Sequence, residues 1–279
     1  MAKKITPGRR LPAPPGSMEV RLLEYLQGQY PILTIRPGAM KDFTILCPEM
    51  AALSHAGQFV HIRVPGFSLR RPISIAQVDK AAGTLRFLFD IRGEGTRVLA
   101  DCKEGNMLDL MGPLGNGFTL LDPSCHAIVV GGGIGVPPML QTALHYGPNA
   151  TAVLGFRSAD KIVLTQDFAD AGILVELCTD DGSAGFHGVV TEPLRRCIEQ
   201  KKPDIVYACG PKIMLKFVAQ LCAQYGVRCQ VSLEERMACG VGACLGCATP
   251  IRQDDGSVTF LHVCKNGPVF DAERVVFDD

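Results

Sequence analysis

Four of the twelve cysteines have a spacing that predicts one loop folded around a single site. Cys239, Cys244 and Cys247 follow the pattern C-x4-C-x2-C, and Cys264 stands alone farther along the chain. Glycines and other small residues between the first three let the loop curl, so that thiolates and backbone N–H groups can converge on inorganic sulfur. This spacing is typical of a 2Fe–2S cluster. It predicts a chain that transfers single electrons.

A structural zinc ion is the main alternative for four cysteines, and a chance spacing is another. Zinc sites usually join two short C-x2-C pairs. Here one compact triplet is joined by the single distant Cys264. The spacing therefore favours the iron–sulfur cluster over zinc.

Length and charge narrow the class of protein. With 279 residues the chain is long enough for two or three domains. Its 28 basic residues balance its 28 acidic residues, so we expect no nucleic-acid partner. No stretch approaches the roughly 18 consecutive apolar residues that cross a bilayer, and the first residues lack the apolar core of a signal peptide. We therefore expect no membrane association and a cytoplasmic protein.

The other eight cysteines agree with a reducing compartment. They are spread through apolar segments, which suits reduced, buried thiols rather than a disulfide framework. These residues are Cys47, Cys102, Cys125, Cys178, Cys197, Cys209, Cys222 and Cys229.

The chain divides into a leader and three segments that differ in their predicted secondary structure. The leader, 1–28, begins with a proline-containing, non-periodic stretch that we expect to be disordered. Segment 29–121 contains short β-rich stretches separated by Gly and Pro, which predict an antiparallel β-barrel. These predicted strands are 32–35, 41–47, 59–64, 73–76, 84–91 and 107–111.

The next segment, 122–228, alternates strand-like and helical patterns, which predicts a parallel α/β sheet. The strands predicted from this alternation are 127–130, 150–156, 174–178, 205–209 and 229–233. The predicted helices are 138–145, 161–169, 190–200 and 213–225. The last segment, 229–279, holds the four spaced cysteines and short predicted strands at 248–252 and 258–263.

Two short motifs in the β-rich segment are candidates for binding a flavin. Arg71 and Ser74 stand three residues apart on an extended segment, so a guanidinium could meet a pyrophosphate while a hydroxyl reaches the edge of a flavin ring. About twenty residues later, Gly95 and Thr96 come at the start of a helix, where free N–H groups and a hydroxyl could hold a phosphate. An ordinary surface turn and an ordinary capped helix are the alternatives.

Two motifs in the α/β segment are candidates for binding a nucleotide. A strand runs into the turn Gly131-Gly132-Gly133-Ile134-Gly135, and a helix follows at Pro137, so the backbone could approach a pyrophosphate at a helix N-terminus. A purely structural turn is the alternative. Cys209 and Gly210 close another strand at the edge where open α/β sheets bind ligands. Cys209 lies there either beside a nicotinamide or as an inert buried thiol.

No histidine has a partner in the sequence that predicts a triad or a metal site. His55, His61, His126, His145, His187 and His262 have neither mutual spacing nor a neighbouring Cys or Asp at ligand distance, so we interpret them as ordinary core or surface residues.

The order of these motifs resembles the ferredoxin reductase superfamily. Within it, the chain closely resembles the electron-transfer subunits of two-component, NAD-dependent (class 1B) dihydroorotate dehydrogenases, over about 29–269. The phrases that carry the resemblance are Arg-Arg-Pro-Ile-Ser-Ile (70–75), Gly-Glu-Gly-Thr (93–96), Gly-Pro-Leu-Gly-Asn-Gly-Phe (112–118), Gly-Gly-Gly-Ile-Gly-Val-Pro-Pro (131–138), Tyr-Ala-Cys-Gly-Pro (207–211) and Val-Ser-Leu-Glu-Glu-Arg-Met-Ala-Cys-Gly-Val-Gly-Ala-Cys-Leu-Gly-Cys (231–247).

The resemblance implies a role for each motif. It implies that FAD is bound by Arg71, Pro72, Ile73, Ser74, Leu88, Phe89, Asp90, Gly95 and Thr96. It implies that NAD is bound by Gly131, Gly132, Gly133, Gly135, Cys209 and Gly210. It implies that the 2Fe–2S ligands are Cys239, Cys244, Cys247 and Cys264. No residue is expected to act as a catalytic acid or base.

The resemblance also implies a partner. A separate FMN-containing catalytic subunit would oxidise dihydroorotate, and electrons would pass through the cluster and FAD of this chain to NAD+, in a heterotetramer of two catalytic and two electron-transfer subunits that serves pyrimidine biosynthesis. This chain shows no pyrimidine pocket of its own.

Two rival functions remain open. Small subunits of bifurcating NAD(P)H:ferredoxin oxidoreductases, and of sulfide-linked ones, share this architecture, but the bifurcating subunits have aspartate at the first cluster position, where this chain has Cys239. A zinc-binding interaction module is the second rival, and it leaves the flavin and glycine motifs unexplained. The choice of NAD over NADP follows the resemblance alone, because Arg157 after the second α/β strand could favour a 2′-phosphate.

Overall fold

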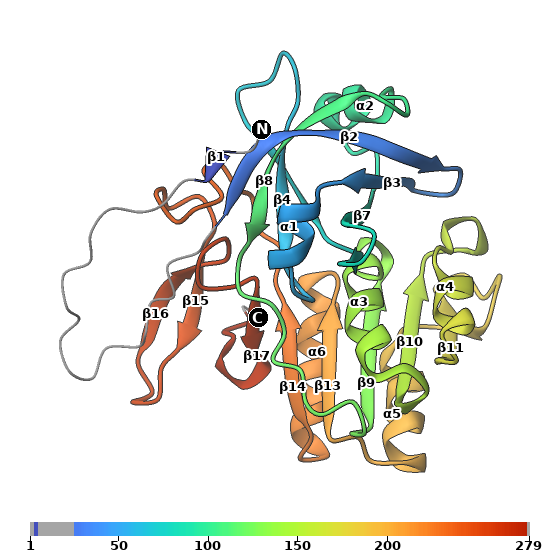
Figure 1. The fold of residues 1–279 in the computed structure, drawn as a ribbon. Coiled ribbons are helices and arrows are strands. Elements are labelled where there is room, and N and C mark those ends of the chain that lie inside the picture. The colour runs from blue at the N-terminus through green and yellow to red at the C-terminus, as the bar shows by residue number, and fades with distance from the viewer. Residues whose placement is uncertain (1–2, 5–24, 278–279) are drawn as a thin grey trace.

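A computed structural model of the chain describes residues 3–4 and 25–277, and it has three parts (Figure 1). A curled β-sheet lies at the top of the view, an α/β sheet with its helices lies below it, and the β15–β16 hairpin stands beside the α/β sheet. Most of the predicted leader lies outside the described residues. Of its last residues, Leu26 to Gly28 belong to strand β2.

The first sheet has eight strands, and every pair in it is antiparallel, as the β-rich segment predicts. Its order is β5-β4-β8-β2-β3-β7-β6, with β1 paired to β2, and its core contains Phe43, Phe87 and Phe89. The strands are β1 (Lys3–Lys4), β2 (Leu26–Arg36), β3 (Lys41–Leu46), β4 (Phe59–Arg63), β5 (Arg71–Ser74), β6 (Gln77–Asp79), β7 (Thr84–Phe89) and β8 (Met107–Leu114). The predicted antiparallel flavin-type domain is confirmed as a curled sheet of this kind.

Two short helices interrupt this sheet. Helix α1 (Pro48–Leu53) was not predicted, because its six residues are too few for a 3.6-residue period to show. It begins at a proline, which suits a first helical turn, and it buries Met50 and Ala51 in the core. Helix α2 (Glu94–Ala100) begins at the predicted glycine turn and buries Leu99.

The second sheet has seven strands in the order β12-β11-β10-β9-β13-β14-β17, all parallel except β17. Alternate residues of β9 supply the cores on its two faces: Ile128 and Val130 pack with α5 and α6, and Ala127 and Val129 pack with α3 and α4. The elements are β9 (Ala127–Gly132), α3 (Pro137–Tyr146), β10 (Ala150–Phe156), α4 (Thr165–Asp170), β11 (Leu174–Thr179), β12 (Phe186–His187), α5 (Thr191–Gln200), β13 (Ile205–Cys209), α6 (Lys212–Gln224), β14 (Arg228–Ser232) and β17 (Val269–Asp271).

One predicted helix is shorter than expected. The predicted helix 161–169 is a 3-10 turn at Ala159–Lys161 followed by α4, which begins only at Thr165. Leu164 separates them, because its φ of 65° lies in the left-handed region that a continuing helix cannot use. The other three predicted helices are confirmed to within a residue or so at each end.

The last segment leaves the α/β sheet and returns to it. After β14 the chain passes through the first three spaced cysteines and forms the antiparallel hairpin of β15 (Ala248–Arg252) and β16 (Val258–His262). It then passes through Cys264 and comes back as β17, which pairs with β14. Both hairpin strands were predicted. Within residues 25–277, no helix is both long and apolar enough to cross a membrane.

Candidate redox site

A cavity of about 260 Å³ lies where the three parts of the molecule meet. The curled sheet contributes the β5 and β7 walls, the α/β sheet contributes the turns after β9 and β13, and the segment after β14 closes a third side. The lining residues are Phe59, Pro72, Ile73, Ser74, Leu88, Phe89, Asp90, Arg92, Thr96, Ile134, Pro137, Cys209, Ser232, Leu233, Glu234, Glu235, Met237 and Pro268. Motifs that are far apart in the sequence therefore share one cavity.

Most of the residues predicted for FAD line this cavity. Seven of the nine are Pro72, Ile73, Ser74, Leu88, Phe89, Asp90 and Thr96. The other two, Arg71 and Gly95, contact each other just behind the wall. A Cβ built on Gly95 would lie 2.4 Å from Nη2 of Arg71, so a side chain at this position would displace the guanidinium. The two flavin motifs are thus joined by a direct contact.

The local contacts of Arg71 fix its direction. Its Nη1 donates a hydrogen bond to the carbonyl of Leu69 at 2.6 Å, and its guanidinium stacks on the ring of Phe67 at 5.0 Å. Thr96 is also engaged locally, since its Oγ1 accepts hydrogen bonds from the backbone N–H groups of Arg92 at 2.8 Å and Gly93 at 3.1 Å. The α2 turn is therefore a preformed element beside the cavity.

The residues predicted for the nicotinamide nucleotide lie at the switch point of the α/β sheet. β9 and β13 are neighbours in the sheet, and the strand order reverses between them: β10 to β12 lie on the β9 side and β14 lies on the β13 side. In this pair of strands, Gly131 is the register partner of Cys209. Ligands of open α/β sheets bind at the carboxyl ends of strands at such a point. A Cβ on Gly135 would lie 2.2 Å from the carbonyl oxygen of Cys209, so glycine is needed for the two turns to meet.

Only Cys209 of the six predicted nicotinamide residues lines the cavity itself, together with Ile134 and Pro137 of the glycine turn. Gly131, Gly132, Gly133, Gly135 and Gly210 are not among its lining residues. Cys209 is 1% exposed, and burial raises its pKa, with the nearby Glu234 raising it further, so the thiol is neutral. Its position agrees with both sequence interpretations: it is a buried thiol, and it borders the cavity.

The four spaced cysteines lie in two pairs. The sulfurs of Cys247 and Cys264 are 3.3 Å apart and buried, and the thiol of Cys244 hydrogen bonds to Cys239. Among the described residues, no three His, Cys, Asp or Glu side chains are grouped to hold one metal ion. Two thiol pairs suit two metal ions, each bound by one pair, better than they suit a single zinc ion.

Backbone N–H groups point at these sulfurs. Cys239 accepts from the N–H of Val241 at 3.5 Å and of Ala243 at 3.3 Å, and Cys264 accepts from Gly242 at 3.2 Å. Burial by itself would raise the pKa of Cys239, but the backbone donors and the Cys244 thiol lower it to about 7. Burial raises the pKa of Cys264 to about 12, so the loop stabilises a thiolate at Cys239 and not at every cysteine. Backbone donors aimed at sulfur fit an iron–sulfur cluster.

Five of the other eight cysteines are buried as expected, and Cys102, Cys125 and Cys229 are only partly buried. All twelve cysteines are free, and burial raises the pKa of Cys47 to about 12 and of Cys178 and Cys197 to about 11. Neutral, buried thiols of this kind are structural.

Sequence reasoning assigned no role to the cavity wall formed after β14. Ser232, Leu233, Glu234, Glu235 and Met237 line it, and Met237 stands two residues before Cys239. The signal was available, since these residues follow a predicted parallel strand and the carboxyl ends of such strands are where ligands bind. Phe59 and Pro268 gave no local signal, because their place depends on the tertiary arrangement.

Comparison with known proteins gives one family. Residues 234–276 match the iron–sulfur cluster binding domain of dihydroorotate dehydrogenase B. Two curated relatives named dihydroorotate dehydrogenase B (NAD(+)), electron transfer subunit, are 41% identical over 83% of this chain and 90% of the relative (Desulforamulus reducens) and 40% identical over 84% and 92% (Streptococcus mutans).

A solved structure of an NADH-dependent reduced ferredoxin–NADP oxidoreductase, studied for flavin-based electron bifurcation, has a TM-score of 0.77 and is 30% identical, covering 89% of this chain and 90% of that one. It shows the same ferredoxin reductase-like fold. The two dehydrogenase relatives are more similar in sequence and are matched over almost their whole length. The chain therefore belongs to the family of electron-transfer subunits of NAD-dependent dihydroorotate dehydrogenase B.

Proposed function

We propose that this protein is the subunit that carries electrons from a catalytic dihydroorotate dehydrogenase partner to NAD+. The observation that carries the proposal is the shared cavity, because its walls come from the flavin motifs, the glycine turn and the segment that leads directly into the cluster loop. When bound, FAD supplies the step between single-electron and hydride chemistry. The chain itself supplies position and electrostatics.

The flavin side of the cavity has the parts that FAD binding requires. Arg71 carries a positive charge against Gly95, where a pyrophosphate would meet both the guanidinium and the α2 turn. Ser74 and the backbone of Leu88 to Asp90 face the cavity, where an isoalloxazine ring would lie. On the opposite wall, Cys209 and Pro137 mark where a nicotinamide would approach, so the two rings would be held together away from water.

The cluster loop has the parts that a 2Fe–2S cluster requires. We assign Cys239 and Cys244 to one iron and Cys247 and Cys264 to the other, following the two thiol pairs. The three backbone N–H donors would remain directed at sulfur. We further propose that 29–121, 122–228 and 229–279 are the flavin, nicotinamide and cluster units. The last unit joins the sheet of the second because β14 pairs with β13 and β17 pairs with β14.

Two exposed apolar side chains near the cluster loop support a place for the partner there. Leu245 follows the ligand Cys244 and is 80% exposed, and Phe260 on β16 is 66% exposed. Apolar side chains this exposed suit an interface. We propose that an FMN-containing catalytic subunit covers this surface, in a complex of two copies of each subunit, in the cytoplasm.

The test compares two routes of electrons. The reconstituted protein alone should oxidise NADH with ferricyanide, and dihydroorotate should leave its flavin oxidised. Adding the catalytic subunit should couple dihydroorotate oxidation to NAD+ reduction. Cys244→Ser should lose the cluster and this coupling while the NADH–ferricyanide activity continues, and Cys197→Ala should keep both. Full coupling in a cluster-free Cys244→Ser complex would refute the path.

The likeness to the NADH-dependent ferredoxin–NADP oxidoreductase favours one alternative partner. If that alternative were correct, the protein would exchange electrons with ferredoxin and with an NADP-binding subunit, and dihydroorotate with its dehydrogenase would not reduce the flavin. Cys239 at the first cluster position favours the dehydrogenase.

A further inference from the structure

His61 is a fully buried side chain between the flavin strand and the cluster loop. It lies on β4 with 0% exposure, and its backbone pairs with Pro72 of the flavin motif on one side and Met111 of β8 on the other. Its ring meets Phe59, two residues earlier on the same face of β4, edge to face at 6.4 Å. Phe59 lines the cavity. Phe59 therefore stands between the His61 ring and the cavity of the proposed flavin site.

The other side of the imidazole meets the cluster loop. A Cβ built on Gly240 would lie 2.6 Å from Nδ1 of His61 and 3.1 Å from its Cε1, so the ring rests directly on the backbone of this residue. Gly240 has a φ of 73° and follows the proposed ligand Cys239. Only a glycine allows both the left-handed turn and the close approach of the ring.

Both ring nitrogens of His61 are without a hydrogen-bond partner among the described residues. Burying an imidazole in this way is unfavourable, and a leucine or phenylalanine would fill an apolar site without that cost. Burial, reinforced by the cations of Arg70 and Arg71, lowers the pKa of His61 to about 4. The ring is therefore neutral at physiological pH and carries one N–H donor and one acceptor.

We propose that His61 is a positioning residue of the electron path. The N–H of its ring donates a hydrogen bond to a sulfur of the iron–sulfur centre, from the side of the cluster that faces the flavin site. The inference rests on the proposed function, since it requires the cluster at Cys239, Cys244, Cys247 and Cys264. A hydrogen bond to sulfur stabilises the reduced, more negative cluster and raises its reduction potential. His61 would thus raise the reduction potential of the cluster while it holds the Gly240 turn against β4.

The test replaces the two nitrogens separately in the FAD- and cluster-loaded protein. His61→Leu removes both, His61→Asn keeps an amide near the place of Nδ1, and His61→Gln keeps one near the place of Nε2. His126→Leu, on the far part of the α/β sheet, is the matched control. The cluster potential is measured by redox titration followed by electron paramagnetic resonance, and pulsed resonance on protein labelled with ¹⁵N-histidine detects a histidine nitrogen coupled to the reduced cluster.

The expected loss in His61→Leu is about tenfold in the equilibrium constant for cluster reduction, which is about 59 mV for a one-electron couple. At least one of the amide variants should recover most of it, and His126→Leu should not differ from wild type. The ¹⁵N coupling should be present in wild type and absent from His61→Asn.

The failures of the two ideas are distinguishable. A wild-type protein that binds no iron–sulfur cluster would refute the proposed function. A loaded His61→Leu protein with the wild-type potential would refute the role of His61 alone. If His61→Leu does not retain the cluster, the labelled wild type decides: no ¹⁵N coupling, or a coupling that persists in His61→Asn, would overturn the inference.

Discussion

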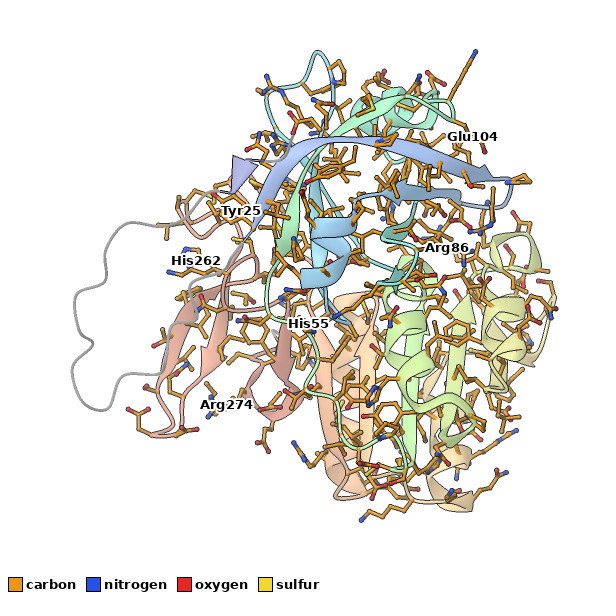
Figure 2. All side chains as sticks on the ribbon, in the orientation of Figure 1. Tyr25, His55, Arg86, Glu104, His262 and Arg274 are labelled. Atoms are coloured by element: carbon orange, nitrogen blue, oxygen red, sulfur yellow. The ribbon has the colours of Figure 1, made fainter. Side chains whose placement is uncertain are left out.

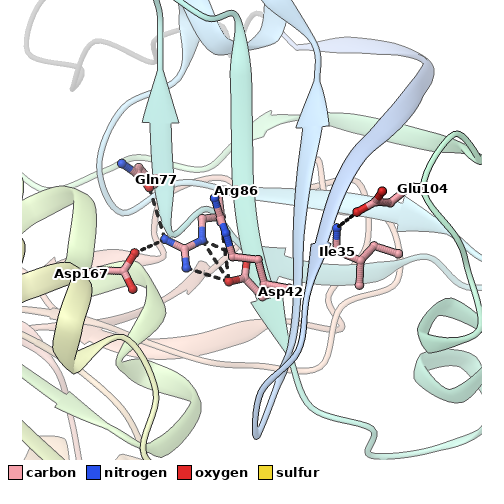
Figure 3. Close-up of polar contacts among 7 residues, drawn as sticks. Ile35, Asp42, Gln77, Arg86, Glu104 and Asp167 are labelled. Atoms are coloured by element: carbon pink, nitrogen blue, oxygen red, sulfur yellow. Dashed lines mark hydrogen bonds and ion pairs between the residues drawn. The ribbon is translucent and has the colours of Figure 1, made fainter.

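The link between the curled sheet and helix α4 leads to a quantitative prediction about stability. Arg86 on β7 is 8% exposed and contacts Gln77 on β6, Asp42 on β3 and Asp167 on α4 (Figure 3). Its Nε and Nη2 hold both carboxylate oxygens of Asp42 on β3 at 2.7 to 3.2 Å, and its Nη1 pairs with Asp167 on α4. Figure 2 places the side chain at the junction of the two sheets.

Arg86→Met keeps the unbranched aliphatic stem but leaves Asp42 buried without its bidentate partner. Removing one member of a buried ion pair costs about 3–5 kcal/mol. Arg36 lies 3.8 Å from Asp42 and is half exposed, so it recovers part of the loss, and Asp167 is a third exposed and can be solvated. We therefore expect a loss near the lower end, about 3 kcal/mol.

Equilibrium urea unfolding followed by circular dichroism measures this loss. The control is Arg195→Met on α5, whose partners Glu192 and Glu199 are surface residues, and it should change the unfolding midpoint little. The double variant Asp42→Leu with Arg86→Met should be less destabilised than the sum of its single variants by about 2–3 kcal/mol, because no buried charge is left unpaired. A single variant within about 1 kcal/mol of wild type, or an additive double variant, would refute the reasoning.

Two further predictions concern the flavin motif and a buried thiol. Gly95→Val should displace the Arg71 guanidinium and weaken FAD binding by about tenfold or more in fluorescence titrations. The control is Gly93→Ala, where a Cβ meets nothing within 4 Å, and this variant should bind FAD normally. Equal affinities of the two variants would show that Arg71 does not bind the pyrophosphate. Burial raises the pKa of Cys47 to about 12, so its thiol stays neutral well above pH 8. Iodoacetamide at pH 8.5 should therefore modify the partly exposed Cys125 and spare Cys47 in the native protein; comparable labelling of both by mass spectrometry would contradict this.

The sequence predicts those parts of the fold that local patterns determine. The antiparallel strands, the α/β alternation and the helices α3, α5 and α6 follow from hydrophobic periods of two and of 3.6 residues. The cysteine spacing and the glycine turns indicate binding sites because each packs its chemistry into a few consecutive residues. Helix α1 is too short to leave such a period, and the break at Leu164 depends on a backbone angle that an ordinary leucine does not indicate.

Contacts between segments that are far apart in the sequence produce no local sequence pattern from which they could be predicted. We interpreted His61 as an ordinary residue because no sequence spacing relates it to Gly240, yet the fold places the two in contact. The same holds for Arg86 and Asp167, which pair across two sheets. The cavity wall after β14 could be predicted only in part. The strand follows from the local pattern, but the cavity that the strand borders exists only because the curled sheet lies above the α/β sheet.

The pairing of β14 with β17 has a consequence for chain entropy at the cluster loop. The chain leaves the sheet after Ser232 and returns at Val269, and these two residues are partners in the ladder, so the whole excursion that holds the four cysteines is a loop closed by sheet hydrogen bonds. The entropy lost on closing a loop is then largely spent when the sheet forms, before any iron arrives. Assembly of the cluster has only to order the tip of a loop whose base is already fixed, which favours insertion of the cluster into the folded protein.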